Sequence, residues 1–430
     1  MATVVLVRSS SSARLPSYRR ALAALDGLRL VVVHPEERPW AAQVVQHWVL
    51  CETTDVELVE RALRAAMERH GFRPDAILSF DEYGVYPAAV LAERMGLRAF
   101  PLPPAALQAT NVKSLFREWC ARHAIRAPRS VALRAPGALP RPDELRFPVV
   151  AKPSAGAGKM LVRKCDDMQQ LAAHVRAMWD KLASPDDHKH TRAMGAPLHV
   201  LVEEYIGGQE VDLDCLVEDG QLRFCAISDN FETHPPFFQE TGGLTPSALP
   251  HKPQEALRSL LLDFLRSHGR ALTGVLHFEA KWDPHRDAAY VIEVNCRMGS
   301  AETRDMVATA YGIDLGEGFI RLALGMPLYA IPRAPLCHAA SVNIYPARQG
   351  VLRAQNIDHQ DPSYVAHALS FKPGDMVTDP TFMIAWIVAA GNTAQNAIKA
   401  VQRLTNNYTQ ALVIEVEDTS ATKPRTIAAL

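Results

Sequence analysis

Two strand-like segments separated by a short turn constrain this chain more than any other part of it. The segment VLHFEAKW (275–282) is followed by the turn-rich DPHRDAA and then by VIEVNCR (291–297). Turn residues of this kind join antiparallel neighbours. If the hairpin is centred near Arg286, Glu279 lies opposite Glu293. Two carboxylates would then face each other across neighbouring strands.

The side chains on one face of this hairpin predict a metal site. In the second segment Glu293, Asn295 and Arg297 alternate with apolar residues, so they share a face. Facing carboxylates repel each other unless a positive charge lies between them. Oxygen ligands from Glu279, Glu293 and Asn295 suit Mg²⁺ or Mn²⁺, which complete their shells with water and substrate phosphates. The alternative is a surface ladder in which the carboxylates pair with Lys281 and Arg297.

A loop of small residues and a nearby lysine predict a phosphate site. The loop SAGAGK (154–159) lets a ligand approach its backbone closely, although a Gly-rich hairpin turn has the same composition. It is not a Walker A loop, because Met160 follows Lys159 and the loop leads into a strand. Lys152 precedes the loop in an apolar run, which favours a phosphate partner over a lysine that extends to solvent. Lys113, in NVKSLF, carries little signal of its own.

The acidic run LVEEYIGGQEVDLDCLV suggests a nucleotide-binding linker. It contains Glu203, Glu204 and Glu210 around a Gly-Gly pair. Such a linker could offer backbone groups to a base edge and a carboxylate to ribose hydroxyls, but by itself a run of this kind is most often an ordinary surface turn.

The order of apolar runs predicts an α/β protein of three parts. In the first hundred residues, short apolar runs alternate with helical patterns, which indicates a parallel sheet with crossover helices. A dinucleotide site there is not favoured, because the polar run after the first strand lacks glycines. The Pro-rich residues 100–107 mark a boundary. We therefore predict domains at residues 1–107, 108–330 with a lid at about 130–200, and 331–430.

Composition excludes several classes of function. The chain has 430 residues and is 48% hydrophobic, enough for several cores. Its 46 basic and 47 acidic residues nearly cancel, so we expect no nucleic-acid or membrane partner. The 7 cysteines form no CxxC pair, which argues against zinc and disulfides. With no apolar segment as long as a membrane span, we expect a cytoplasmic protein, and the sequence leaves open whether it is a homo-oligomer.

Taken in order, these motifs resemble the ATP-grasp superfamily of carboxylate–amine ligases. The resemblance covers about residues 1–330 and implies an ATP-grasp fold with a preceding Rossmann-like domain and a small C-terminal α/β domain. Two stretches, AISDNFETHPPFFQETGGLTPSALP and EVNCRMGSAETRDMVATAYGIDL, resemble the amino-acid ligase branch and most of all the catalytic region of the carnosine synthase family.

The resemblance implies a role for each motif. ATP would be bound with Mg²⁺ or Mn²⁺, and with two such ions. Arg297 would stabilise charge on an acyl phosphate and on the tetrahedral intermediate, with Lys152 contributing. The other implied contacts are phosphates at Lys113, Lys152, Ser154, Gly156, Gly158 and Lys159, adenine at Glu203, Glu204, Tyr205 and Ile206, ribose at Glu210, and metal at Glu279, Glu293 and Asn295.

The implied reaction joins an amino-acid carboxylate to the amine of a second amino acid, giving a dipeptide, ADP and phosphate. Arg304 could clamp a carboxylate, and Glu232, His234 and Glu240 could meet an ammonium group. The alternatives are a ligase that joins an amino acid to a non-peptide molecule, a biotin carboxylase-like subunit, and a nucleotide-binding module without turnover. The chain has no GxSxG nucleophile motif.

Overall fold

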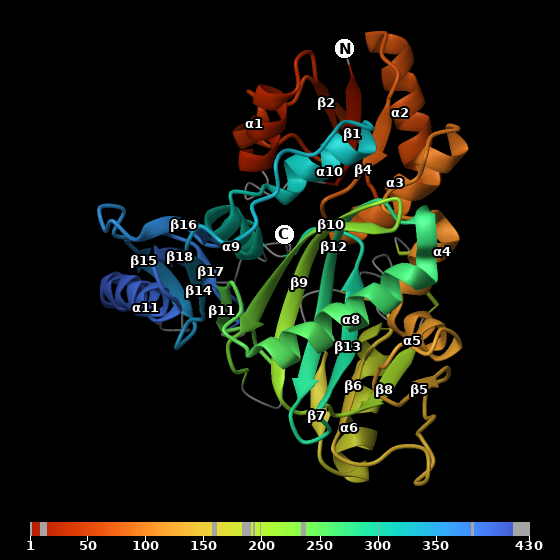
Figure 1. Cartoon of the computed structure of the whole chain (residues 1–430), viewed down its shortest axis with the longest axis vertical. Coiled ribbons are helices and arrows are strands. Elements are labelled where there is room, and N and C mark those ends of the chain that lie inside the picture. Colours follow the sequence, from red (N-terminus) through yellow and green to blue (C-terminus); the bar gives the residue numbers. More distant parts are fainter. Residues whose placement is uncertain are drawn as a thin grey trace, which may run out of the picture.

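The computed structural model describes the chain from end to end apart from short gaps and the last residues. The described residues are 2–8, 15–156, 161–182, 191, 194–197, 199–233, 238–299, 301–379 and 382–415. The predicted positions Gly158, Lys159 and His234 lie outside them. Helices and strands are mixed throughout, and a long central sheet lies between an N-terminal sheet and a smaller sheet (Figure 1).

The N-terminal part is a parallel sheet, as predicted, with strand order β3-β2-β1-β4. The apolar runs are buried along their length because helices and neighbouring elements cover the sheet; Val4 to Val7, for example, are fully buried. The elements are β1 (Thr3–Val7), α1 (Leu15–Ala24), β2 (Arg29–His34), η2 (Pro39–Ala41), β3 (His47–Leu50), α2 (Val56–His70), β4 (Ala76–Leu78) and α3 (Glu82–Arg94).

A small antiparallel sheet follows, with strand order β5-β8-β6-β7. Strands β6 and β7 form a hairpin whose connection contains the predicted phosphate loop. One face packs on α6 around Leu171, Val175 and Met178. The elements are α4 (Pro104–Asn111), α5 (Lys113–Arg122), β5 (Ser130–Leu133), β6 (Val149–Pro153), β7 (Arg163–Cys165), α6 (Met168–Leu182) and β8 (Val200–Glu204).

The central sheet has eight strands in the order β13-β12-β9-β10-β11-β14-β18-β16. Helix α8 crosses strands of this sheet (Figure 1), and its apolar side is buried in the same core as β9 and β12. The elements up to residue 330 are β9 (Gln209–Glu218), β10 (Gln221–Asn230), β11 (Gly242–Thr245), α8 (His251–His268), η3 (Gly269–Ala271), β12 (Gly274–Asp283), β13 (Ala288–Asn295), α9 (Ala301–Tyr311) and α10 (Leu315–Ala323).

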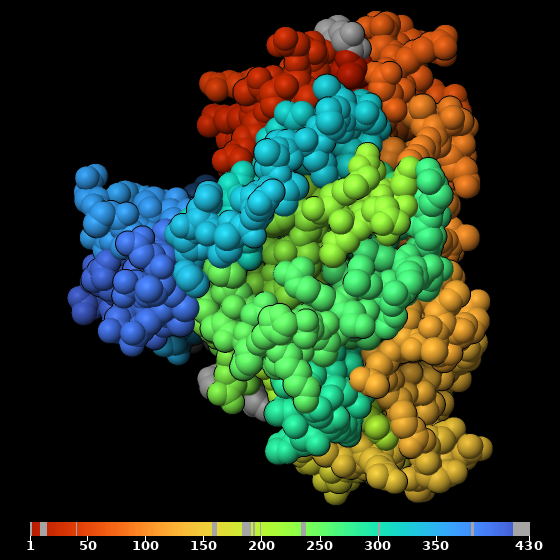
Figure 2. Space-filling view, in the orientation of Figure 1, coloured from red at the N-terminus to blue at the C-terminus, as the bar shows by residue number. Residues whose placement is uncertain are grey.

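The C-terminal segment extends the central sheet. Strand β14 pairs with β11, so hydrogen bonding continues across the boundary proposed near residue 330. In the space-filling view this segment, in blue, projects from one side of the molecule (Figure 2). A three-stranded sheet, β17-β15-β19, lies within it. The elements are β14 (His338–Ile344), β15 (Gly350–Ala354), β16 (Tyr364–Leu369), β17 (Met376–Val377), β18 (Ala385–Gly391), α11 (Ala394–Ala411) and β19 (Val413–Glu415).

The predicted hairpin is confirmed in register as well as in topology. Strands β12 and β13 are antiparallel, and Glu279 pairs with Glu293. The ladder shifts by a bulge immediately after Glu279, which bends the strand at the position where the carboxylates face each other.

Phe319 of α10 joins the N-terminal sheet to the central sheet. Its fully buried ring lies 6.1 Å from the ring of Phe80 and 6.5 Å from that of Phe100. The ring also meets Gly274, where an added Cβ would lie 2.6 Å from the Phe319 ring. Glycine is therefore required at the start of β12, and the aromatic ring fills the space that remains.

Phe319→Ala should destabilise the protein by about 3–5 kcal/mol, because it removes a fully buried ring and leaves a cavity at this junction. Urea unfolding followed by circular dichroism would measure the change. Phe382→Ala is the matched control, since that ring is 55% exposed. A loss below about 1 kcal/mol in Phe319→Ala would show that the junction repacks around the missing ring.

Candidate active site

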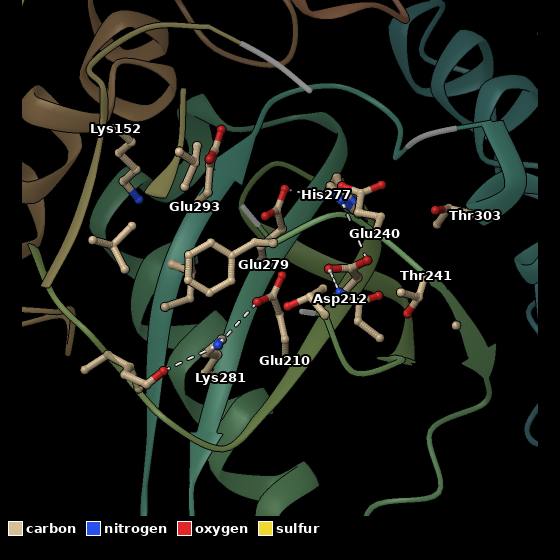
Figure 3. A pocket seen from close by; sticks show the side chains of 18 of the residues that line it. Lys152, Glu210, Asp212, Glu240, Thr241, His277, Glu279, Lys281, Glu293 and Thr303 are labelled. Atoms are coloured by element: carbon tan, nitrogen blue, oxygen red, sulfur yellow. Dashed lines mark hydrogen bonds and ion pairs between the residues drawn. The ribbon is translucent and has the colours of Figure 1, made fainter. Parts of the chain in front are cut away.

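The candidate site is a cavity of about 270 Å³ between the small sheet and the central sheet. Strands β6 and β8 provide one wall, and β9, β12 and β13 provide the floor. Helix α9 and strand β14 close the end opposite Lys152, as the position of Thr303 indicates (Figure 3). Residues far apart in sequence therefore meet around one space.

Lys152 is the predicted phosphate lysine of β6, and it is buried rather than extended to solvent. Its Nζ lies 2.7 Å from Oε2 of Glu203, and Nε of Arg117 lies 2.6 Å from Oε1 of the same carboxylate. Burial lowers the pKa of Lys152 despite Glu203, and Arg117 adds to that lowering. Glu203 keeps a lowered pKa, because these two cations outweigh its burial. Its side chain thus positions Lys152.

Lys113 starts α5 and borders the same cavity. Its Nζ lies 2.9 Å from Oε1 of Glu293 and donates a hydrogen bond to the carbonyl oxygen of Gly156 at 3.1 Å. Burial alone would lower the pKa of Lys113, but the charge of Glu293 outweighs it and the pKa is raised. The structure thus brings together a lysine with little sequence signal, the phosphate loop and a predicted metal ligand.

Ser154 does not face the cavity. Its buried hydroxyl lies 2.6 Å from that of Ser114 and accepts a hydrogen bond from the Ser114 amide. The side chain fastens the start of the predicted phosphate loop to α5. Gly156, two residues on, does border the cavity, with a φ of 138° that favours glycine.

Glu279, Glu293 and Asn295 are the predicted metal ligands, and both carboxylates border the cavity (Figure 3). Nδ2 of Asn295 donates to Oε1 of Glu279 at 3.1 Å. Among the residues that the structure describes, no three His, Cys, Asp or Glu side chains are grouped to hold a metal ion. A donor set of carboxylate and amide oxygens fits Mg²⁺ or Mn²⁺, which take further ligands from phosphate and water.

Arg297 follows β13 and borders the cavity. Its Nε lies 2.7 Å from Oε2 of Glu82, the first residue of α3. Burial would lower the pKa of Arg297, but Glu82 outweighs it and the pKa is raised. Sequence reasoning missed Glu82, and no local motif marks it, because it lies in the N-terminal part.

The predicted nucleotide segment follows β8 and borders the cavity. The backbone amides of Glu204 and Tyr205 donate to the carbonyls of Arg129 and Pro148, which immediately precede β5 and β6. The carbonyl of Ile206 accepts a bond from Nζ of Lys281 at 3.4 Å. That ammonium also lies 3.5 Å from Oε2 of Glu210 and 5.2 Å from the centre of the Tyr205 ring (Figure 3). Lys281 therefore ties the segment to the predicted ribose carboxylate.

Sequence reasoning missed three buried residues: Asp212 and His277, which border the cavity, and Asp214, which lies behind them against His277. Nδ1 of His277 lies 2.9 Å from Oδ1 of Asp214, and its Nε2 lies 3.6 Å from Oε1 of Glu279. Burial raises the pKa of Asp212 to about 7, although the charge of His277 opposes this. The sequence does contain a signal for these residues. Asp212 and Asp214 are two positions apart, as are His277 and Glu279, so each pair shares one face of its strand in the way that Glu293 and Asn295 do.

The four predicted substrate residues do not lie together in the structure. Glu240 borders the cavity (Figure 3). Glu232 is exposed outside it, and His234 lies outside the described residues. Arg304 is buried away from the cavity, where its guanidinium pairs with Asp314 and Asp305. The structure therefore does not bring Arg304 to the cavity.

Comparison with known proteins defines the class. Residues 145–305 match the family model of the ATP-grasp domain. The crystal structure of an L-amino acid ligase from Bacillus licheniformis matches 97% of this chain and 99% of that chain, with a TM-score of 0.84 at 18% identity. Phosphoribosylglycinamide synthetase from Anaerococcus prevotii matches 97% and 100%, with a TM-score of 0.70 at 14% identity. The chain contains an ATP-grasp domain, and the predicted ATP-grasp fold is confirmed.

More specific similarity is to carnosine synthases. Carnosine synthase 1 of Gallus gallus is 33% identical over 319 residues, which are 70% of this chain and 33% of that protein. The Homo sapiens protein is 27% identical over 336 residues, 75% of this chain and 40% of that protein. The chain thus spans 33% to 40% of the length of these relatives. The predicted resemblance is confirmed.

No described helix has the length and apolarity needed to cross a membrane.

The His277 cluster predicts a pH-dependent stability. Burial would lower the pKa of His277, but Asp214 and Asp212 outweigh it and raise the pKa to about 10 from 6.5. The proton is bound more tightly in the folded state. This contribution is therefore complete below pH 6.5 and is lost as the pH rises towards 10.

Urea unfolding across that pH range should show a steeper loss of stability in the wild type than in His277→Gln. His251→Gln is the matched control, since the His251 side chain is 85% exposed. Equal pH slopes in the wild type and His277→Gln would contradict the assignment.

Proposed function

We propose that the protein is an ATP-dependent, ADP-forming ligase that joins an amino-acid carboxylate to the amine of a second amino acid. One observation carries this proposal: three cationic side chains and two facing carboxylates border a single cavity. The cations are Lys113, Lys152 and Arg297, and the carboxylates are Glu279 and Glu293. Similarity to the carnosine synthases and to an L-amino acid ligase supports amino acids as substrates.

The proposed chemistry uses ATP to make the carboxylate reactive. A carboxylate oxygen attacks the γ-phosphorus of ATP, ADP leaves, and an acyl phosphate forms. The amine nitrogen then attacks the acyl carbon, phosphate departs with that oxygen, and the amine loses a proton. No side-chain nucleophile is required. The chain must position phosphates, balance charge and exclude water.

The residues of the cavity are suited to these tasks. Lys152 and Lys113 are held by carboxylates before any ligand binds, so their ammonium groups need little reorganisation to meet phosphate oxygens. Mg²⁺ or Mn²⁺ held by Glu279, Glu293 and Asn295 would neutralise phosphate charge, and two ions are proposed. Arg297 presents a planar guanidinium that suits the oxygens of an acyl phosphate.

Glu293→Gln should lower kcat by about 100-fold or more while the fold persists, because the amide keeps the shape but loses the charge that holds the cation. Initial rates of ADP release over a range of Mg²⁺ concentrations would measure the effect. Glu255→Gln, at an exposed position of α8, is the matched control. A kcat within about twofold of wild type at moderate Mg²⁺ would rule out Glu293 as a metal ligand.

With ATP, Mg²⁺ and suitable amino acids, the enzyme should make a dipeptide and release one ADP per bond. β-Alanine with histidine is the first pair to test, given the named relatives, and mass spectrometry would identify products across other pairs. A carboxylate labelled with ¹⁸O should pass its label to the released phosphate. Label in AMP, with pyrophosphate as co-product, would overturn the acyl-phosphate route.

A further inference from the structure

A polar recess closes the end of the cavity that faces away from Lys152. It is formed by Glu302 in the first turn of α9 and by Ser341 and Asn343 on β14. Thr303, the neighbour of Glu302, lies across the cavity from Lys152 (Figure 3). The recess therefore combines residues from either side of residue 330, and it borders the substrate side rather than the phosphate side.

The recess is rigid and buried. Glu302 is 5% exposed, Ser341 is fully buried and Asn343 is 7% exposed. The backbone amide of Asn343 donates to the carbonyl of Thr241 at 3.1 Å. The hydroxyl of Ser341 accepts a hydrogen bond from the backbone amide of Gly243 at 3.0 Å. Both strand residues are thus fixed against β11, and their positions do not depend on a flexible loop.

The orientation of the Asn343 amide follows from its neighbour. Nδ2 of Asn343 donates to Oε1 of Glu302 at 3.3 Å, and a carboxylate can only accept from it. The carbonyl oxygen Oδ1 is left buried, with no hydrogen-bond partner among the described residues. An unmatched buried acceptor costs about 1–3 kcal/mol. A ligand with N–H donors would remove that cost, and a cationic ligand would also suit the carboxylate.

The chemistry of the reaction selects between the two substrate amines. The attacking amine must lose its proton, so a carboxylate that holds it as ammonium would oppose the reaction. The amine of the activated amino acid must remain unreactive, and protonation ensures this. We propose that Glu302 and Asn343 bind the ammonium group of the amino acid whose carboxylate is activated. This inference rests on the proposed function and gives the C-terminal segment a part in substrate choice.

Calorimetry with a nonhydrolysable ATP analogue and Mg²⁺ present would test it. The probes are β-alanine and propionate, which lacks only the amine. Wild type should bind β-alanine at least about tenfold more tightly than propionate, and Asn343→Leu should lose that preference. In turnover, the variant should raise KM for β-alanine about tenfold and leave KM for ATP unchanged. Asn406→Leu, at an exposed position of α11, is the matched control.

The outcomes that would overturn the inference differ from those that would overturn the proposed function. Equal binding of β-alanine and propionate by the wild type would overturn the inference, even if the ligase reaction is observed. An unchanged preference in Asn343→Leu would also overturn it. Should that variant fail to fold by circular dichroism, Glu302→Gln decides by the same two measurements. Absence of dipeptide with every amino-acid pair would instead overturn the proposed function, and the binding comparison would still judge the recess.

Discussion

The guanidinium of Arg117 connects three parts of the molecule around the cavity. It binds the carboxylate of Glu203 on β8, and its Nη2 donates to the carbonyl of Ile292 on β13 at 2.6 Å. Because Glu203 also holds Lys152, one guanidinium on α5 sets the distance between the small sheet and the central hairpin. Removing one partner from such a buried pair costs about 3–5 kcal/mol, since the other charge stays buried and unpaired. The site therefore has its shape only in the assembled fold.

This arrangement explains how a cavity can contain so many charges before a nucleotide arrives. Lys152 is matched by Glu203, Lys113 by Glu293, and Arg297 by Glu82. Each pair offsets the desolvation of its members. The cations are then directed at the cavity in advance, so a bound polyphosphate meets dipoles and charges that are already oriented. Lys113 differs from Lys152 in one respect, because its partner is also a proposed metal ligand. A cation bound at Glu293 would offset the charge of that carboxylate, so Lys113 could attract phosphate from the position it already occupies.

Patterns within short segments of the sequence predicted the hairpin and the parallel sheet, because both depend on residues that are close in the chain. The period of two and the short turn were enough to place Glu279 opposite Glu293, and apolar runs were enough for the parallel sheet. The partners of cations could not be predicted in this way. Arg297 meets Glu82 across 215 positions, and a carboxylate so distant leaves no pattern near the motif. The position of Arg304 could not be predicted for a related reason, because its proximity to Arg297 in sequence does not show which side of α9 it occupies. Asp212, Asp214 and His277 also follow a period of two, but no local pattern shows that β9, which carries the two aspartates, pairs with β12.

The continuity of the central sheet links the two ends of the cavity. The phosphate end uses β12 and β13, whereas the recess end uses β14, and the intervening strands β9, β10 and β11 are hydrogen-bonded throughout. Side chains at both ends therefore project from one rigid scaffold, which suits a reaction that needs the carboxylate placed accurately against a phosphate. Because β14 and α9 contribute no phosphate-binding lysine, substitutions there can alter which amino acid fits without disturbing the charged pairs at the other end. Under the proposed function, the sheet thus keeps the residues that would activate the carboxylate apart from those that would select the amino acid.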